Sequence, residues 1–293
     1  MYDKTNGYIW INGNAVKWKD ANIHIMTHSL HYASSVFEGI RAYGGKILKA
    51  YEHYNRLYES AEYLNHNISY TIEKLINITN KLMTKNNLEN CYIRVLVWYG
   101  SKKMTVSYNG GDTNIAIVMW KRIIDYSNDN YIHGIHVNVS DWRRPDPKTT
   151  PAHIKASGLY MISAISKYKS EKLGFNDSIM LDYEDNIAEA TSANIFFIEN
   201  RIIYTPPVKC FLNGITRRIC IEIAKENGIK VIEKNFTLND LLKVEEIFLT
   251  GTAIEILPIN TITINKNNIL KFKPGKITKI IQEKFRNLTM MIN

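Results

Sequence analysis

A lysine with small neighbours stands in the segment 151–160, PAHIKASGLY, directly after a turn rich in Pro and Thr. Most lysines are solvated at the protein surface. Lys155, however, is flanked by Ala, Ser and Gly, which would let a flat ligand approach closely. A lysine held away from water becomes an amine nucleophile able to form a Schiff base. The segment is compatible with either a surface lysine or a covalent site.

A carboxylate with unusual surroundings follows in AEATSANIFF, where Glu189 stands between apolar stretches. An unpaired carboxylate would be costly there. It is either a glutamate paired to the backbone or to an arginine, or a carboxylate that faces a protonated pyridine nitrogen and makes the ring an electron sink. Asn194, before the apolar Ile-Phe-Phe, is expected to be buried and hydrogen-bonded.

Three further segments carry groups that bind anions. Gly214, Ile215 and Thr216 open an amphipathic helix, so free backbone N–H groups and the positive end of the helix dipole point at one spot. A threonine at this position is more often a simple helix cap. Residues 250–252, Thr-Gly-Thr, follow an apolar strand and offer amides and hydroxyls. Arg56, in a predicted helix, is either solvated or a fork for a phosphate.

The elements that must position these residues begin with two hairpins. An Asn-Gly turn lies within YIWINGNAVKW and a Gly44–Gly45 turn within FEGIRAYGGKILKAY. Apolar periodicity then predicts helices over residues 52–64 and 72–87, followed by strands over 91–100 and 114–120.

The composition changes after Trp120, where KRIIDYSNDNYIHG is polar and rich in turn residues. This predicts a linker over residues 121–133 between an N-terminal domain, 1–120, and a C-terminal domain, 134–293. In the second domain we expect a helix that ends near Lys169 and another from Gly214, with Gly228 as its C-cap. Strands are expected over 135–142, 178–183, 194–206, 230–236, 246–253 and 261–270, and a final helix over 277–288.

The bulk composition excludes several classes of protein. With 293 residues, 45% hydrophobic and 22% charged, the chain can build a sizeable core. It carries no apolar run long enough to span a bilayer and no signal-peptide pattern at its start, which predicts a cytoplasmic protein. The net charge of +9 comes from scattered lysines without a basic tract, which argues against nucleic-acid binding and is compatible with phosphate-bearing ligands.

The three cysteines form no CxxC motif, and Cys91 and Cys220 are expected to be buried and reduced. The eight histidines include no HExxH, so no metal site is predicted.

Taken in order, these segments resemble the fold-type IV pyridoxal-phosphate enzymes, above all the branched-chain amino acid aminotransferases. The most specific matches are EATSANIF with LNGITR, and HSLHYASSVFEGIRAY. The resemblance covers nearly the whole chain. It implies an α+β fold of two domains, like that of D-amino acid aminotransferase, with a smaller N-terminal α/β domain and a larger C-terminal domain built on a β-barrel-like core. It also implies an active site at the domain interface and a homo-oligomer, a dimer at least.

The resemblance implies a role for each candidate residue. Lys155 would be the catalytic residue and bind pyridoxal 5'-phosphate covalently, Tyr160 would contact its phenolic oxygen, and Glu189 its ring nitrogen. The implied cofactor-binding residues are Arg56, Lys155, Tyr160, Glu189, Asn194, Gly214, Ile215, Thr216, Gly251 and Thr252. The implied substrate-binding residues are Tyr32, Phe37, Gly39, Arg41, Tyr92, Arg94, Thr252 and Ala253, and for Tyr32 and Phe37 ordinary core packing is the alternative.

The implied reaction moves the amino group of L-leucine, L-isoleucine or L-valine to 2-oxoglutarate by a ping-pong mechanism, giving branched 2-oxo acids and L-glutamate. The alternatives are a D-amino acid aminotransferase or an aminodeoxychorismate lyase on the same fold, and more remotely a non-catalytic binding protein. Arg94 and VFEGIR favour the branched-chain activity. The chain departs from the family pattern at EATSAN, where the family often has Glu-Gly, and in the loop after Trp120, where Tyr126 is only a candidate pocket residue.

Overall fold

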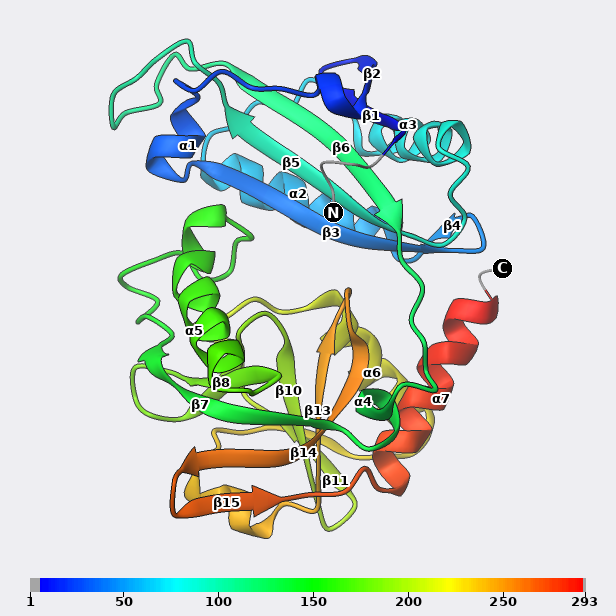
Figure 1. Cartoon of the computed structure of the whole chain (residues 1–293), viewed down its shortest axis with the longest axis vertical. Helices are drawn as coiled ribbons and strands as arrows, with labels where there is room; N and C mark the ends of the chain where they lie inside the picture. Colours follow the sequence, from blue (N-terminus) through cyan, green and yellow to red (C-terminus); the bar gives the residue numbers. More distant parts are fainter. Residues whose placement is uncertain (1–5, 292–293) are drawn as a thin grey trace. The chain divides into compact units, whose positions relative to one another are not determined.

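The computed structural model describes residues 6–291, so the outermost ends of both predicted domains lie outside the described residues. The chain divides into two compact units (Figure 1). Unit 1 comprises Met1–Ile123, Ile154–Tyr160 and Thr289–Asn293, and unit 2 comprises Ile124–His153 and Met161–Leu288. Lys155 and Tyr160 therefore belong to unit 1, and Glu189 belongs to unit 2. The predicted domain limits at 120/121 and 133/134 stay a prediction.

Unit 1 is built on a six-stranded antiparallel sheet with the order β2-β1-β6-β5-β3-β4. Both predicted hairpins are confirmed, because β1 pairs with β2 and β3 with β4. Their turns need left-handed backbone, which Asn12-Gly13 and Gly44-Gly45 supply. The strands are β1 (Tyr8–Ile11), β2 (Asn14–Lys17), β3 (Ser35–Tyr43), β4 (Lys46–Ile47), β5 (Cys91–Tyr99) and β6 (Thr113–Lys121).

Two long helices supply the apolar cover for one face of this sheet. They are α2 (Ala50–Tyr63) and α3 (Ile72–Lys85), both close to their predicted limits, and Thr71 caps α3 by accepting a hydrogen bond from the Lys74 amide. Unit 1 also contains the short elements η2 (Trp18–Asp20) and α1 (His28–Tyr32). The core between the helices and the sheet includes Leu57 and Leu75, both fully buried.

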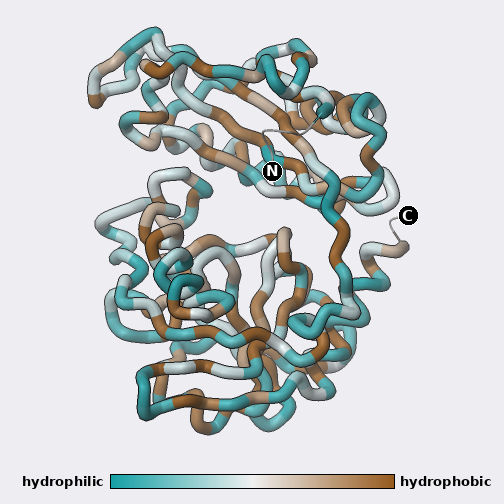
Figure 2. Tube along the Cα trace, in the orientation of Figure 1, coloured by the Kyte–Doolittle hydropathy of each residue, from teal (hydrophilic) through white to brown (hydrophobic). Residues whose placement is uncertain are grey.

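Strand alternation gives β3 and β5 two chemically different faces. Val36, Ile40, Ile93 and Val95 are buried in the core against the helices. The residues between them, among them Phe37 and Arg94, therefore lie on the opposite face of the sheet. The brown segments of the central strands in Figure 2 mark this apolar contribution.

Unit 2 is built on a nine-stranded, mostly antiparallel sheet that curls into a half-barrel, as expected for the β-barrel-like core. Its main path runs β12-β11-β10-β13-β14-β7-β8-β9, and β15 pairs with β14. The strands are β7 (Ile135–Arg143), β8 (Asp177–Leu181), β9 (Ile187–Ala190), β10 (Asn194–Glu199), β11 (Ile202–Thr205), β12 (Val231–Glu233), β13 (Glu246–Gly251), β14 (Glu255–Asn265) and β15 (Asn268–Lys271).

The helices of unit 2 are α4 (Asp129–Ile132), α5 (Met161–Lys172), α6 (Ile215–Glu226) and α7 (Lys276–Met291), with a short η4 (Asn239–Lys243). In α6 the predicted apolar face is confirmed, since Ile215, Ile219 and Ile223 are all buried. Gly228 follows the end of α6 with φ 68°, the left-handed backbone expected of a residue that terminates a helix.

The runs expected as single strands over 194–206 and 261–270 are each divided by a turn, into β10 and β11 and into β14 and β15, and the strand β9 was not foreseen at all. Glu189 lies inside β9, a four-residue strand that pairs with β8 and is buried along its whole length. A strand buried on both faces lacks the polar alternation that reveals half-buried strands, and this one is also short. The three cysteines are buried and free, as predicted for Cys91 and Cys220. None of the helices within residues 6–291 is long and apolar enough to cross a membrane.

Candidate active site

The backbone of Lys155 is fixed by two elements of unit 1. The Lys155 amide donates to the Ser60 hydroxyl on α2 at 3.0 Å, and the Lys155 carbonyl accepts from the Phe37 amide on β3 at 3.0 Å. Beside it, Ala156 forms an isolated antiparallel bridge with Val36. The segment 154–157 thus extends the edge of the sheet. These backbone contacts hold the Lys155 Cα in place, and the side chain is not needed for them.

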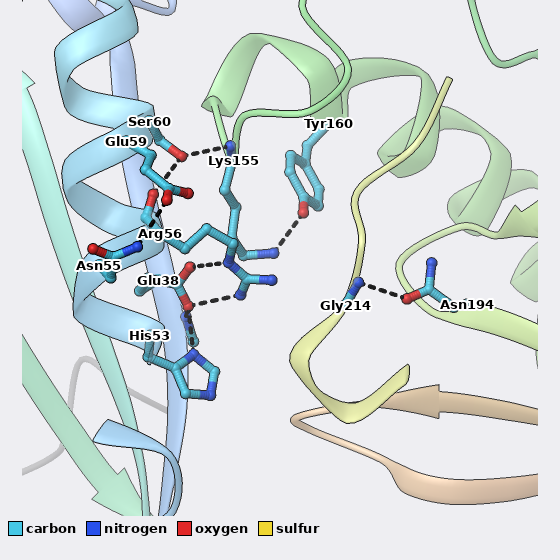
Figure 3. Close-up of polar contacts among 11 residues, drawn as sticks. Glu38, His53, Asn55, Arg56, Glu59, Ser60, Lys155, Tyr160, Asn194 and Gly214 are labelled. Carbon is cyan, nitrogen blue, oxygen red and sulfur yellow. Dashed lines mark hydrogen bonds and ion pairs between the residues drawn. The ribbon is translucent and has the colours of Figure 1, made fainter. Parts of the chain in front are cut away.

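The Lys155 side chain ends beside Tyr160. The Lys155 Nζ donates to the Tyr160 hydroxyl at 2.7 Å (Figure 3). Between them, the 3₁₀ turn η3 (Ser157–Tyr160) brings the tyrosine back toward the lysine, which accounts for their five-residue spacing. The Phe37 ring packs edge-on against Tyr160 at 4.9 Å between centroids, and Lys155 Nζ lies 4.9 Å from the Phe37 centroid. The amine is therefore held between aromatic rings.

Arg56 is buried on α2 and held by a carboxylate that the sequence did not point to. Its Nε and Nη2 donate to the two oxygens of Glu38 at 2.6 and 2.9 Å. Its Nη1 is buried and has no hydrogen-bond partner among the described residues. A guanidinium nitrogen in that state is suited to an anionic ligand. Arg56 is thus a buried donor rather than a solvated helical arginine.

Five of the predicted substrate residues share neighbouring positions on the face of the sheet opposite α2. Strand register places Gly39 beside Arg94 and Arg41 beside Tyr92. The Tyr92 hydroxyl lies over Gly39, where a Cβ would come within 1.8 Å of it. The Arg94 guanidinium stacks on the Phe37 ring at 4.6 Å. The structure therefore brings these residues together, and the shared face predicted for Tyr92 and Arg94 is confirmed.

Two members of the predicted set have other described contacts. Arg41 lies over the Tyr43 ring at 4.7 Å and donates to the Arg122 carbonyl at 3.3 Å. Tyr32 ends the short helix α1, is 43% exposed, and contacts the rings of His28 and His31. The described contacts of Tyr32 are thus with α1, and its role as a pocket wall stays a prediction.

In unit 2, Glu189 is a buried carboxylate that contacts Arg144 and Asn194. Its Oε1 lies 2.9 Å from Nη2 of Arg144, and its Oε2 accepts from the Asn194 side-chain amide at 3.3 Å. Arg144 also donates to the Thr191 carbonyl at 3.1 Å. Both side chains of the pair are at least nine-tenths buried. Arg144 and Asn194 together fix the orientation of the Glu189 carboxylate.

Asn194 also shapes the turn that opens α6. Its side-chain amide donates to the Leu212 carbonyl at 3.0 Å, while its Oδ1 accepts from the Gly214 amide at 3.1 Å (Figure 3). Gly214 is the N-cap of α6 and has no side chain to cap it. Ile215 and Thr216 begin the helix and are buried. The amides in the first turn of an α-helix have no partner within the helix, so those of α6 are suited to an anion, and their role as an anion site stays a prediction.

The second predicted anion segment lies at the end of β13. Thr250 is 1% exposed, and its hydroxyl has no hydrogen-bond partner among the described residues. Gly251 ends the strand and pairs with Glu255, and Thr252 and Ala253 form the connecting turn. An orphaned hydroxyl beside a turn is a donor suited to a ligand. Thr252 and Ala253 are half-buried there.

The candidate loop residue Tyr126 is anchored within unit 2. Its hydroxyl hydrogen-bonds to the Glu255 carboxylate, and the Arg286 guanidinium lies over its ring at 4.0 Å. Tyr126 therefore anchors the segment between β6 and β7. Its role as a pocket residue stays a prediction.

Four residues of these clusters were missed: Glu38, His53, Ser60 and Arg144. Glu38 gave one signal, since it is an acidic residue inside the apolar run VFEGI. Arg144 follows a strand as one of two adjacent arginines, and nothing in its spacing points to Glu189. Their partners are set by tertiary contacts between distant segments.

Comparison with known proteins was informative over nearly the whole chain. Residues 35–262 match the family described as amino-transferase class IV. A relative from Rickettsia conorii, named probable branched-chain-amino-acid aminotransferase, is 39% identical over 281 residues, covering 96% of this chain and 95% of the relative.

Two solved structures are similar to the whole chain. The branched-chain amino acid aminotransferase of Escherichia coli superposes with a TM-score of 0.90 at 34% identity, covering 97% of this chain and 95% of the other. The branched-chain amino acid aminotransferase of Thermobaculum terrenum, solved in its PLP-form, gives a TM-score of 0.87 at 25% identity, covering 98% and 95%. The fold expected from the motifs is thereby confirmed, and the chain belongs to the class IV aminotransferases.

Proposed function

We propose that this class IV aminotransferase uses pyridoxal 5'-phosphate to transfer the amino group of L-leucine, L-isoleucine or L-valine to 2-oxoglutarate. Family membership supports the reaction class, and the names of the relatives support the substrates. The observation that carries the proposal is the Lys155 amine, which is bonded to Tyr160 and fixed through its backbone by α2 and β3.

The residues present fit this cofactor. Its aldehyde requires an amine, which Lys155 offers. Its ring nitrogen requires a carboxylate, which buried Glu189 offers. Its phosphate requires several donors, and the chain has Arg56 Nη1, the first turn of α6 and the Thr250 hydroxyl, of which the first and last are buried without partners among the described residues.

The bound cofactor would supply an electron sink for the electrons of the broken α C–H bond. Lys155 would bind the cofactor in the resting enzyme and, once displaced, carry the proton between the substrate α-carbon and the cofactor. Tyr160 would hold the Lys155 amine in position through its hydroxyl. Glu189, oriented by Arg144 and Asn194, would keep a proton on the ring nitrogen.

The face that carries Phe37, Gly39, Tyr92 and Arg94 is proposed to bind the substrate. Phe37 offers an apolar surface for a branched side chain, and Arg94 offers a guanidinium for the second carboxylate of 2-oxoglutarate. One pocket would then accept both substrates in alternation, as ping-pong transfer requires. Thr252 and Ala253 are proposed to contact the substrate α-carboxylate.

We also propose a cytoplasmic homo-oligomer, a dimer at least. Unit 1 exposes the apolar side chains of Ile25 (73%), Leu30 (58%) and Val106 (77%), a pattern typical of association surfaces. Sedimentation as a monomer at micromolar concentration would contradict this association.

The proposed function is tested by visible absorption of the purified protein. The lysine-bound cofactor should give a visible band that bleaches with L-isoleucine alone and returns with 2-oxoglutarate. Lys155→Ala should abolish both the band and transamination, while the exposed control Lys148→Ala should keep them. A band that ignores L-isoleucine but responds to D-alanine or aminodeoxychorismate would overturn the substrate class. A colourless protein that the cofactor cannot reconstitute would overturn the reaction.

A further inference from the structure

Glu38 is a charged residue in a place where the sheet is otherwise apolar. It lies on β3 between Val36 and Ile40, on the side that packs against α2, and it is fully buried. Burying an isolated carboxylate costs several kcal/mol or more, so a residue of this kind needs compensating partners. The apolar core of unit 1 does not itself require a charge at this position.

The Glu38 carboxylate is fully engaged by its neighbours. It accepts from Arg56 Nε and Nη2 and from His53 Nδ1 at 2.8 Å (Figure 3). It also accepts from the Gly39 amide at 3.2 Å. Burial by itself raises the pKa of Glu38, but the Arg56 guanidinium and the His53 hydrogen bond outweigh it, so this pKa lies far below its usual range. Burial lowers the pKa of His53 against the opposing effect of Glu38. At neutral pH, therefore, Glu38 and Arg56 are charged and His53 is neutral.

This arrangement leaves the Nη1 group of Arg56 available to a ligand. A guanidinium is planar and presents its donors in a rigid fork. Glu38 takes the edge formed by Nε and Nη2, which fixes the plane and leaves Nη1. The same helix holds Ser60, whose hydroxyl donates to the Arg56 carbonyl at 2.8 Å and accepts from the Lys155 amide. The Arg56 guanidinium and the Lys155 backbone are thus both positioned by α2.

We propose that Glu38, assisted by His53, is a positioning residue that aims Arg56 Nη1 at the phosphate of the cofactor. This role for Glu38 rests on the proposed function, because it requires that the cofactor is pyridoxal phosphate. Glu38 does not touch the phosphate, since an anion beside it would be repelled. Its contribution is to hold the guanidinium rigidly, so that less conformational entropy is lost when the phosphate binds.

The test compares two ligands that differ only in the phosphate. The dissociation constants of pyridoxal phosphate and of pyridoxal are measured by absorbance titration of the cofactor-free full chain. Glu38→Gln is expected to weaken pyridoxal phosphate about 10- to 100-fold and pyridoxal less than about 3-fold, the range of a lost charge-assisted contact. The matched control is Glu59→Gln, an exposed glutamate that accepts from Asn55 on α2, the helix that carries Arg56, and it should change neither value.

A second pair of variants covers the case in which Glu38→Gln does not fold. His53→Asn keeps a side-chain amide donor near Glu38, whereas His53→Leu removes it. The Leu variant should weaken pyridoxal phosphate by roughly 3- to 10-fold without affecting pyridoxal, and the Asn variant should resemble wild type.

A double-mutant cycle tests whether Glu38 acts through Arg56. If Glu38 acts only through Arg56, adding Glu38→Gln to Arg56→Gln should not weaken pyridoxal phosphate further. Equal losses for both ligands, or unchanged phosphate affinity in Glu38→Gln, would overturn the positioning role while leaving the function in place. A wild-type protein that binds neither ligand would overturn the proposed function, and the role of Glu38 with it.

Discussion

At the scale of single residues, Arg94 is a half-buried cation whose Nε is buried without a hydrogen-bond partner among the described residues. Its guanidinium stacks on Phe37. Stacking on a ring orients the guanidinium plane without using its N–H donors. The N–H donors of Arg94 can therefore bind a carboxylate in the plane of the guanidinium. The flat face of the guanidinium meanwhile packs on Phe37, the surface proposed for an aliphatic side chain.

Arg94→Ala should separate the two substrates of the proposed reaction. We expect kcat/KM for 2-oxoglutarate to fall about 100-fold, because a charged hydrogen bond contributes about 1.5–3 kcal/mol. The value for the oxo acid of isoleucine should fall less than about 5-fold, since that substrate has no second carboxylate. Steady-state kinetics of both half-reactions measures this. Arg94→Lys should be intermediate, and equal losses for the two oxo acids would remove Arg94 from this role.

The single residues that sequence could identify were those inside short motifs. Lys155 and Tyr160 lie within one ten-residue segment, and Glu189 and Asn194 within another. Glu38 and Arg144 were missed because each acts through a partner far along the chain, Arg56 and Glu189 respectively. Such pairings depend on how strands and helices pack, which no local pattern encodes.

At the scale of elements, the turn before α6 depends on the absence of one side chain. Asn194 at the start of β10 bonds to both Leu212 and Gly214, so the loop and the helix start are tied to the sheet. A Cβ on Gly214 would lie 2.3 Å from Asn194 Oδ1. The backbone of Gly214 is extended, with φ −61° and ψ 142°, so it is close approach rather than backbone freedom that requires glycine.

Gly214→Ala should therefore push Asn194 away and break the bond that it accepts. We expect the free energy of unfolding of the cofactor-free protein to fall by about 2 kcal/mol, since a buried amide and a buried carbonyl oxygen lose their partner. Urea denaturation measures it. Gly251→Ala is the matched control, because its Cβ would meet only ordinary contacts from 3.5 Å outward, and it should change stability by less than about 0.5 kcal/mol. Similar values for both variants would contradict the clash.

Elements with strong local signals were predicted well. The hairpins had left-handed turn residues, and α2, α3 and α6 had apolar faces at helical spacing. The strand β9 was not predicted, because its four residues are buried on both sides and its strand conformation depends on pairing with β8. The curl of the sheet in unit 2 was known only through the resemblance, since curvature follows from long-range pairing and bulges.

At the scale of the whole molecule, buried histidines make the folded state sensitive to acid. His66 stacks on Tyr99 at 4.1 Å, and its Nε2 donates to the Ser34 carbonyl at 3.0 Å. Its Nδ1 is buried without a hydrogen-bond partner among the described residues, so a proton there would be buried without compensation. Burial lowers the pKa of His66 to about 4. The pKa of His53 is also lowered by burial.

The sign of the effect follows from the lowered pKa. Below about pH 6.5 the unfolded chain binds protons at these histidines and the folded chain does not, so stability falls as the pH drops. For His66 the loss should amount to about 3 kcal/mol between pH 6.5 and 4 and be complete below its folded-state pKa. Urea denaturation of the cofactor-free protein at several pH values measures it.

His66→Gln is the matched variant, because glutamine keeps a donor at the place of Nε2 but cannot titrate. Its stability should decline less steeply between pH 6.5 and 4 than that of wild type, by about 2 kcal/mol or more over the interval. The decline that remains would come from other groups, His53 among them. Identical slopes for the two proteins would show that His66 does not carry the effect.

The three buried cysteines have a practical consequence. Burial raises the pKa of Cys91 to about 11 and that of Cys210 to about 12, and it raises the pKa of Cys220 as well. At pH 7 roughly one Cys91 thiol in ten thousand is then ionised, and only the thiolate reacts readily with alkylating reagents. A cysteine introduced at an exposed position would outcompete all three native thiols. A dye or a surface tether can thus be attached at one chosen position of the chain without first replacing the three native cysteines.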